Sequence, residues 1–181
     1  RMSLAERVRV RWKMAKLLGG IVPKVPWFLP GAPWNMARLL EERARKDGES
    51  TAILFEDRRY TWEQVNAEVD RMARAFLEIG IGKGDVVVVL LDNRPEFLFA
   101  VTALNRLRAA GALVNTNIAG SALVHAIQIA DPVAILVGQE HREKVGESIH
   151  ELDRVSEDRV FVQGEAETCD AGEFRSFDDI V

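Results

Sequence analysis

The sequence predicts a doubly wound α/β fold: a mostly parallel sheet with helices on both faces, preceded by a β-hairpin and an N-terminal amphipathic helix. Three observations predict it. From about residue 50 to residue 165, strand-like and helix-like stretches alternate, which is the pattern of βαβ units. Val86 to Leu91 is continuously apolar, as expected for a strand covered on both faces. Two short strand patterns flank Glu56-Asp57, which is typical of a hairpin.

Residues 1–33 are predicted to form a separate segment, a basic amphipathic helix followed by a proline-rich apolar stretch. Over residues 4–18, apolar side chains including Trp12 recur at helical spacing, opposite basic side chains. Residues 1–24 carry a net charge of +6, so the rest of the chain, whose total is -4, carries -10. A basic patch confined to one terminal segment does not indicate a nucleic-acid-binding protein. The helix has the composition of one that lies on an anionic membrane surface.

An α/β subdomain is predicted over residues 34–165. Thr61 and Gln64 have the spacing of a capping box, which predicts a helix start, and Gly80 is expected just beyond the end of that helix. Pro95 is expected in the first turn of a later helix, where its missing N–H does no harm. The predicted helices are 34–46, 62–79, 95–108, 121–130 and 140–152, and the predicted strands are 51–55, 58–61, 86–91, 112–115, 133–137 and 159–162.

Residues 166–181 are predicted to be a polar tail that runs into a missing remainder. The tail ends on Ile180-Val181, two apolar residues that have the character of the start of another element. We therefore expect the sequence to be the truncated first part of a longer domain.

The composition excludes several classes of protein. Hydrophobic residues make up 48% and charged residues 29% of the 181 residues, as in ordinary folded proteins. A single cysteine, Cys169, allows no internal disulfide and fits a reducing compartment, so we expect a cytoplasmic protein that can lie on a membrane surface. No apolar run is long enough to span a bilayer, and the N-terminus lacks the apolar core of a signal peptide.

No motif in the sequence supplies catalytic chemistry. The glycines in Gly80 to Gly84 follow a helix and precede a strand, the reverse of a phosphate-binding loop, so they are interpreted as a helix end and a turn. His125, His141 and His150 lack metal-ligand spacing, and a structural role is expected for each. Asn93 to Glu96 follows the buried strand, where a doubly wound fold can place binding groups, but helix-start chemistry explains it as well. The residues thus indicate no catalytic group and no metal site, and leave any cofactor-binding residue unknown.

Four motifs nevertheless resemble core motifs of the adenylate-forming (AMP-binding) enzymes, in family order and spacing. The first resembles the family's hairpin and helix start, the second its glycine turn and valine strand, and the third its "N-x-P-E" helix start. In order, the four motifs are Phe55 to Val65, Gly80 to Val87, Asp92 to Phe97 and Leu107 to Ala112. The stretch from Asn115 to His125, with the basic N-terminus, is similar to the branch of long-chain or very-long-chain fatty acyl-CoA synthetases and fatty-acid-transport proteins.

This resemblance implies a two-step reaction for the complete enzyme. A fatty acid, ATP and Mg²⁺ would give an acyl-adenylate, and CoA would then displace AMP. The family's phosphate loop, adenine motif, ribose-binding aspartate and C-terminal lysine come later in such chains, so the resemblance implies no catalytic residue here. We expect this chain alone to bind none of these cofactors and to be inactive.

Three alternatives stay open from the sequence. The chain could belong to another adenylate-forming ligase, such as an aryl-CoA ligase, a luciferase-like enzyme or an adenylation domain. It could be a doubly wound module that binds a nucleotide or flavin without ligase activity, although the glycine fingerprint expected after the first parallel strand is missing. It could also be a complete, non-catalytic interaction protein. Acyl chain length and oligomeric state are not predicted.

Overall fold

A computed structural model describes residues 35–164 and 171–180 of the chain. The whole predicted segment 1–33, with its helix at residues 4–18 and the proline-rich stretch after it, lies outside these residues, and so does Cys169.

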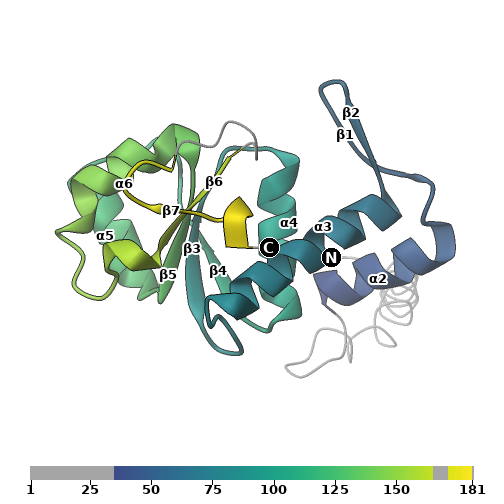
Figure 1. Cartoon of the computed structure of the whole chain (residues 1–181), viewed down its shortest axis with the longest axis horizontal. Helices are drawn as coiled ribbons and strands as arrows, with labels where there is room; N and C mark the ends of the chain where they lie inside the picture. The colour runs from purple at the N-terminus through teal and green to yellow at the C-terminus, as the bar shows by residue number, and fades with distance from the viewer. Residues whose placement is uncertain (1–34, 165–170, 181) are drawn as a thin grey trace, which may run out of the picture. The chain divides into compact units, whose positions relative to one another are not determined.

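The described residues form a two-stranded antiparallel hairpin and a five-stranded parallel sheet (Figure 1). The strands are β1 (Thr51–Phe55), β2 (Arg58–Thr61), β3 (Val86–Leu90), β4 (Ala110–Leu113), β5 (Ala134–Gly138), β6 (Val160–Gln163) and β7 (Arg175–Ser176). The α-helices are α2 (Met36–Asp47), α3 (Trp62–Glu78), α4 (Pro95–Arg106), α5 (Ser121–Ala130) and α6 (Arg142–Ile149). Short 3₁₀ turns occupy Gln139–His141, Glu157–Arg159 and Asp178–Ile180.

The large sheet has the strand order β4-β3-β5-β6-β7, with parallel pairing throughout. Strand β3, the continuous apolar run of the sequence, lies inside the sheet between β4 and β5, as predicted. Its alternate residues face opposite sides. Val87 and Val89 join one core cluster, whereas Val88 and Leu90 join the other. Each such buried aliphatic side chain contributes about 2 kcal/mol of transfer free energy.

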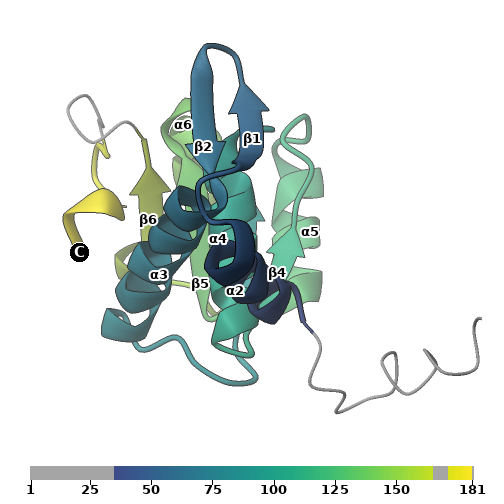
Figure 2. The same ribbon diagram turned by 90° about the vertical axis from the view of Figure 1, so that its right-hand side faces the viewer.

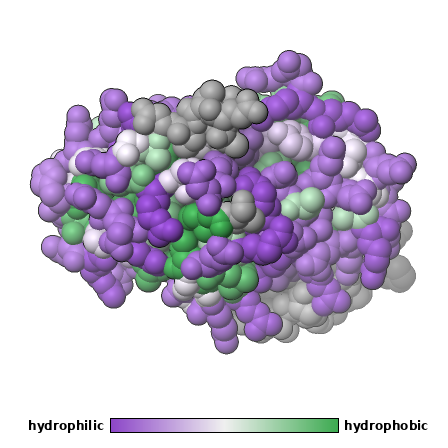
Figure 3. Space-filling model, in the orientation of Figure 1, coloured by the Kyte–Doolittle hydropathy of each residue, from purple (hydrophilic) through white to green (hydrophobic). Residues whose placement is uncertain are grey.

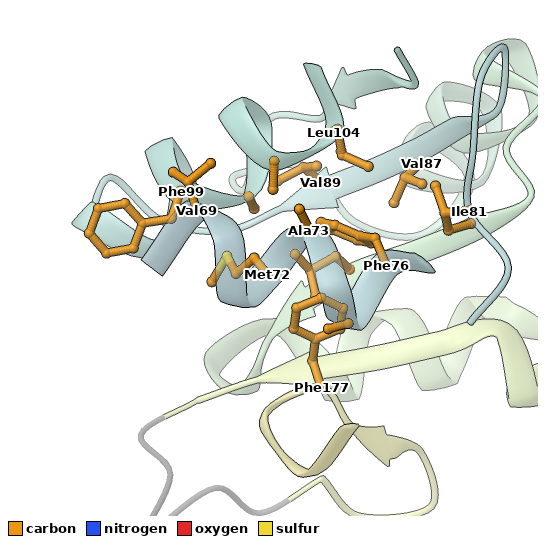
Figure 4. Close-up of a cluster of buried hydrophobic side chains, with 14 of the residues drawn as sticks. Val69, Met72, Ala73, Phe76, Ile81, Val87, Val89, Phe99, Leu104 and Phe177 are labelled. Carbon is orange, nitrogen blue, oxygen red and sulfur yellow. The ribbon is translucent and has the colours of Figure 1, made fainter. Parts of the chain in front are cut away.

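Helices cover both faces of the sheet, which confirms the doubly wound prediction. Helices α3 and α4 pack on one face and α5 and α6 on the other (Figures 1 and 2). Figure 4 shows the first core, where Phe76 of α3 meets Phe177 from the end of the described chain, with ring centroids 4.8 Å apart. On the face in view in Figure 3, hydrophilic side chains dominate around one apolar area near the centre.

The hairpin and helix α3 form as predicted. The Thr61 hydroxyl accepts a hydrogen bond from the Gln64 N–H at 3.2 Å, and Gln64 Oε1 accepts one from the Thr61 N–H at 2.8 Å, so the capping box is complete. The hairpin is anchored to α4 by an ion pair from Arg58 to Glu96 at 3.2 Å. Tyr60 adds an edge-on ring contact with Phe99 at 5.5 Å.

Strand β4 and helix α6 differ most from the sequence prediction. Strand β4 starts at Ala110 rather than Ala112, because Ala110 N–H donates to the Asp85 carbonyl and Val86 then pairs with Ala110. Asn115 leaves the strand and its side chain closes a turn by accepting from the Asn117 N–H at 2.9 Å. Helix α6 is shorter than the predicted 140–152, because a 3₁₀ turn precedes it and it ends at Ile149.

A further difference concerns the predicted polar tail at 166–181. Arg175 and Ser176 add strand β7 to the sheet, paired with Phe161 and Val162. Phe177 is fully buried against α3. The stretch predicted as a polar tail therefore contains a short edge strand, with Arg175 exposed and Phe177 buried.

Candidate functional site at the carboxyl ends of the strands

The strand order places a topological switch point between β3 and β5. Chain leaving β3 enters α4 on one face of the sheet, whereas chain leaving β5 enters α6 on the other face. The order β4-β3-β5-β6-β7 is the 2-1-3-4-5 arrangement of one large class of doubly wound folds, with β3 as strand 1. Such sheets bind ligands in the crevice where neighbouring connections diverge in this way. The candidate site therefore lies at the carboxyl ends of β3 and β5, on the side of the sheet called the carboxyl edge below.

Three polar side chains converge there. Asp92 follows β3, and Glu140 and His141 follow β5, with one possible ligand atom from each lying within 4.8 Å of the others. His141 Nε2 lies 2.8 Å from Asp92 Oδ1, and because an ionised carboxylate can only accept, the imidazole donates. This hydrogen bond is the main cause that lowers the pKa of Asp92, helped by Thr116 and by the charge of Arg94. Asp92 is therefore a carboxylate at neutral pH.

Arg94 joins three strand ends at this edge. Its Nη2 donates to the Gln163 carbonyl at 3.1 Å and to the Gln163 side-chain oxygen at 2.7 Å, at the end of β6. Its guanidinium lies 3.6 Å from Glu140 and 3.9 Å from Glu96. Gln163 is 2% exposed, so the network reaches into the interior. A single arginine thus connects the segments that follow β3, β5 and β6.

Several buried atoms at this edge lack a hydrogen-bond partner. Among the described residues, four buried side-chain atoms have none, and Arg94 Nε, Glu96 Oε2 and Gln139 Oε1 belong to the carboxyl edge. Native structures leave few such groups unpaired, and water or ligand atoms often complete them. The carboxyl edge is therefore polar and incompletely satisfied, as a binding region would be.

Asp92, Glu140 and His141 are residue types that bind divalent cations. In this structure all three already have protein partners, because His141 pairs with Asp92 and Arg94 lies beside Glu140. A bound cation would have to displace these interactions. Two carboxylates at the crevice also oppose an ATP triphosphate, so these residues do not fit that group by themselves.

The structure brings together some of the residues considered from the sequence and leaves others apart. Arg94 and Glu96 of the Asn93–Glu96 stretch belong to the carboxyl-edge network. His141 also belongs to it, whereas His125 and His150 are exposed. The glycine cluster is a helix end and turn, as predicted: Gly80 and Gly84 have φ of 81° and 92°, and Asp85 Oδ2 accepts from the Gly82 N–H at 2.7 Å.

Sequence reasoning missed the pairing of Asp92 with His141. The two residues are 49 positions apart, so no local spacing reveals it. The available signal was positional, since polar residues directly after two neighbouring parallel strands must meet at the same edge of the sheet. Using that signal requires knowing that β5 pairs with β3.

Comparison with known families identifies the chain. Residues 40–177 match the family described as AMP-binding enzyme, which is more than half of the sequence. The chain belongs to this AMP-binding family. The match spans all four motifs and extends through the segment that forms β7.

Two curated relatives of the AMP-binding family show the range of proteins that the chain resembles. It is 30% identical over 133 residues to the mouse (Mus musculus) "Long-chain fatty acid transport protein 6". This alignment covers 73% of this chain and 20% of that protein. It is 28% identical over 143 residues to a "Crotonobetaine/carnitine--CoA ligase" of Salmonella paratyphi C. This alignment covers 76% of this chain and 28% of that protein. The chain thus spans between 20% and 28% of the length of these relatives.

A solved structure supports the fold. The chain superposes on the crystal structure of the anthranilate CoA ligase AuaEII in complex with anthranoyl-AMP, with a TM-score of 0.74 and 22% identity. The superposition covers 86% of this chain and 29% of that one. The parallel sheet with helices on both faces is therefore a fold found in adenylate-forming enzymes.

Proposed function

We propose that this chain is the N-terminal piece of a fatty acyl-CoA synthetase. The complete enzyme activates a fatty acid with ATP and Mg²⁺ to an acyl-adenylate and then forms the thioester with CoA. The observation that supports this proposal most is the family match over residues 40–177, together with the likeness to a long-chain fatty acid transport protein. The basic N-terminal segment also suits an enzyme that takes its substrate from a membrane.

Another adenylate-forming ligase is the second candidate. The likeness to a crotonobetaine/carnitine–CoA ligase favours a small polar acid as substrate, at an identity only slightly lower. The non-catalytic nucleotide- or flavin-binding module is disfavoured by the family match. The identity of the acyl substrate distinguishes these two ligase candidates.

In this proposal the described residues provide scaffold rather than catalytic groups. The carboxyl edge carries Asp92 and Glu140, whose charges repel a triphosphate, and the chain lacks the glycine-rich phosphate loop of the family. ATP, Mg²⁺ and CoA are therefore bound mainly by the later part of the enzyme, and the 181-residue chain alone is inactive.

The test is a substrate panel for AMP release. The full-length protein that contains this chain is incubated with Mg-ATP, CoA and one acid at a time: palmitate, crotonobetaine or anthranilate. We expect palmitate to give the highest kcat/KM and the 181-residue chain to give no AMP above a blank. A preference for crotonobetaine or anthranilate would move the protein to the second candidate, and turnover by the chain alone would refute its inactivity.

The proposed partner of the N-terminal segment is an anionic membrane surface, with the protein cytoplasmic and peripheral. Each Lys or Arg near such a surface contributes about 1 kcal/mol, which salt screens. The competing reading is that residues 4–18 pack on the remainder of the enzyme. Among the described residues no helix combines the length and hydrophobicity that crossing a bilayer requires.

Vesicle co-sedimentation distinguishes these two readings. Binding of the chain should need anionic lipid, weaken at high salt, and fall when Arg9, Lys13 and Lys16 are changed to Glu. A variant that starts at Trp34 is the control. Equal sedimentation of this variant would exclude the helix as the anchor.

A further inference from the structure

A pocket opens at the amino ends of the strands, called the amino edge below, on the side of the sheet opposite the Asp92–His141 cluster. It lies between the C-terminal end of α5 and the segment that leads into β6, and has a volume of about 250 Å³. Its floor is formed by the apolar residues Ile127, Val155 and Pro132, all of which are buried, with Ile127 and Val155 1% and 4% exposed. Leu152 completes the apolar wall. The pocket is thus an apolar hollow at the protein surface.

The rim of the pocket carries an arginine with donors to spare. Arg154 pairs with Asp131 through Nη1 alone, and among the described residues its Nη2 and Nε have no hydrogen-bond partner. The side chains of Arg154 and Asp131 are 69% and 56% exposed. An ion pair this exposed contributes little to stability, so Arg154 can turn toward a ligand without large loss.

We propose that this pocket binds a small monocarboxylate with an apolar body, of the size of benzoate or hexanoate. A dry cavity of about 150 Å³ admits benzene, and pockets for drug-sized ligands begin at about 300 Å³, so 250 Å³ suits a ligand between them. The apolar body lies against Ile127 and Val155, and the carboxylate accepts two hydrogen bonds from Arg154. Asp131 and Asp153 also line the pocket, and their charges oppose any anion, a phosphate dianion more strongly than a monocarboxylate.

The ligand would join two segments that enter neighbouring strands. Asp131 and Pro132 lead into β5, and Val155 leads toward β6. A bound carboxylate would therefore hold these segments together and raise the thermal midpoint of the chain. This inference rests on the pocket alone and does not depend on which acid the complete enzyme activates.

The direct test is an NMR titration of the 181-residue chain with benzoate, with benzyl alcohol as the matched uncharged ligand. We expect saturable shifts at Ile127, Leu152 and Val155 with a Kd on the order of 1 mM. Benzyl alcohol should bind at least about tenfold more weakly, because it cannot form the paired, charge-assisted hydrogen bonds. Absence of saturable shifts, shifts confined to other residues, or equal binding of the alcohol would overturn the proposal.

Two exposed positions sharpen the test. Arg154→Gln should weaken benzoate binding at least about tenfold. Asp131→Asn should tighten it a few-fold, because it releases Arg154, and asparagine tolerates the left-handed backbone at this position (φ 48°). Arg74→Gln, at an exposed arginine on α3, is the control and should change nothing. Unchanged binding by Arg154→Gln, or weaker binding by Asp131→Asn, would refute the role of Arg154.

Discussion

The two edges of the central sheet hold their loops in different ways. At the amino ends of the strands, backbone groups of near neighbours close most turns, as in the contacts of Gly80 with Leu77 and of Asp85 with Gly82. At the carboxyl ends, side chains pair across 49 positions from Asp92 to His141 and across 69 from Arg94 to Gln163. The loops at the amino edge are therefore fixed mainly by contacts between residues close in sequence. The loops at the carboxyl edge are fixed by contacts that form only when the sheet has assembled.

Buried side-chain atoms without a hydrogen bond show a similar contrast. Among the described residues, three of the four, Arg94 Nε, Glu96 Oε2 and Gln139 Oε1, lie at the carboxyl edge, and the fourth is Arg106 Nε at the end of α4. The amino edge has its own long-range side chain, Arg159, but that residue donates to the Ile79 and Val133 carbonyls and completes the turns. Open α/β sheets typically bind their main ligand at the carboxyl ends of the strands, and a network that is satisfied only in part suits that purpose.

The largest effect is expected at Arg94. Changing it to Met keeps much of the side-chain volume but leaves Glu96, Glu140 and Gln163 without their shared donor. Glu96 keeps its ion pair with Arg58, but its Oε2 loses the nearby guanidinium of Arg94, and its side chain is only 16% exposed. We expect the free energy of unfolding in urea to fall by about 2 kcal/mol.

Arg154→Met is the matched control for this prediction. Its ion pair with Asp131 lies at the amino edge and is largely exposed, so the loss should be less than about 0.5 kcal/mol. Equal losses for the two variants would mean that Arg94 is no more important than a surface charge, and the contrast between the edges would fail.

An intermediate loss of unfolding free energy is expected for a substitution at Gly84, in the turn before β3. Its φ of 92° is a backbone conformation that side chains disfavour, although no atom would contact an added Cβ. Gly84→Ala should therefore lose about 1–2 kcal/mol of unfolding free energy through backbone strain alone. Gly82→Ala, in the same turn, also meets no atoms and has no positive φ, so its stability should stay unchanged. A similar loss in both variants would point to a cause other than φ.

The contrast between the edges also explains what the sequence could predict. The capping box of Thr61 and Gln64, the hairpin and the apolar strand β3 depend on near neighbours, and the structure confirms all three. The predicted start of β4 was wrong by two residues, because pairing with β3 determines where β4 begins. The Asp92–His141 contact and strand β7 were missed, because both require knowing which strands lie side by side.

The smallest effect concerns the pH dependence contributed by Asp92. The hydrogen bond from His141 lowers the pKa of Asp92 in the folded protein, so this carboxylate stabilises the fold above its unfolded pKa of about 3.9. That contribution is lost as the pH falls through the folded pKa. Because the side chain is 53% exposed, we expect less than about 1 kcal/mol. Asp92→Asn should therefore be slightly less stable than the wild type at pH 7 and equal to it in acid.

Urea titrations at intervals from pH 7 down to about pH 2, below the lowered folded pKa of Asp92, measure this difference. Asp57→Asn, at the hairpin tip, is the control for removing an exposed carboxylate outside the Asp92–His141 pair. If the Asp92→Asn difference stayed constant with pH, it would reflect lost packing or geometry rather than charge. If it grew in acid, the sign of the linkage would be reversed, and the hydrogen bond from His141 could not be what holds Asp92 ionised.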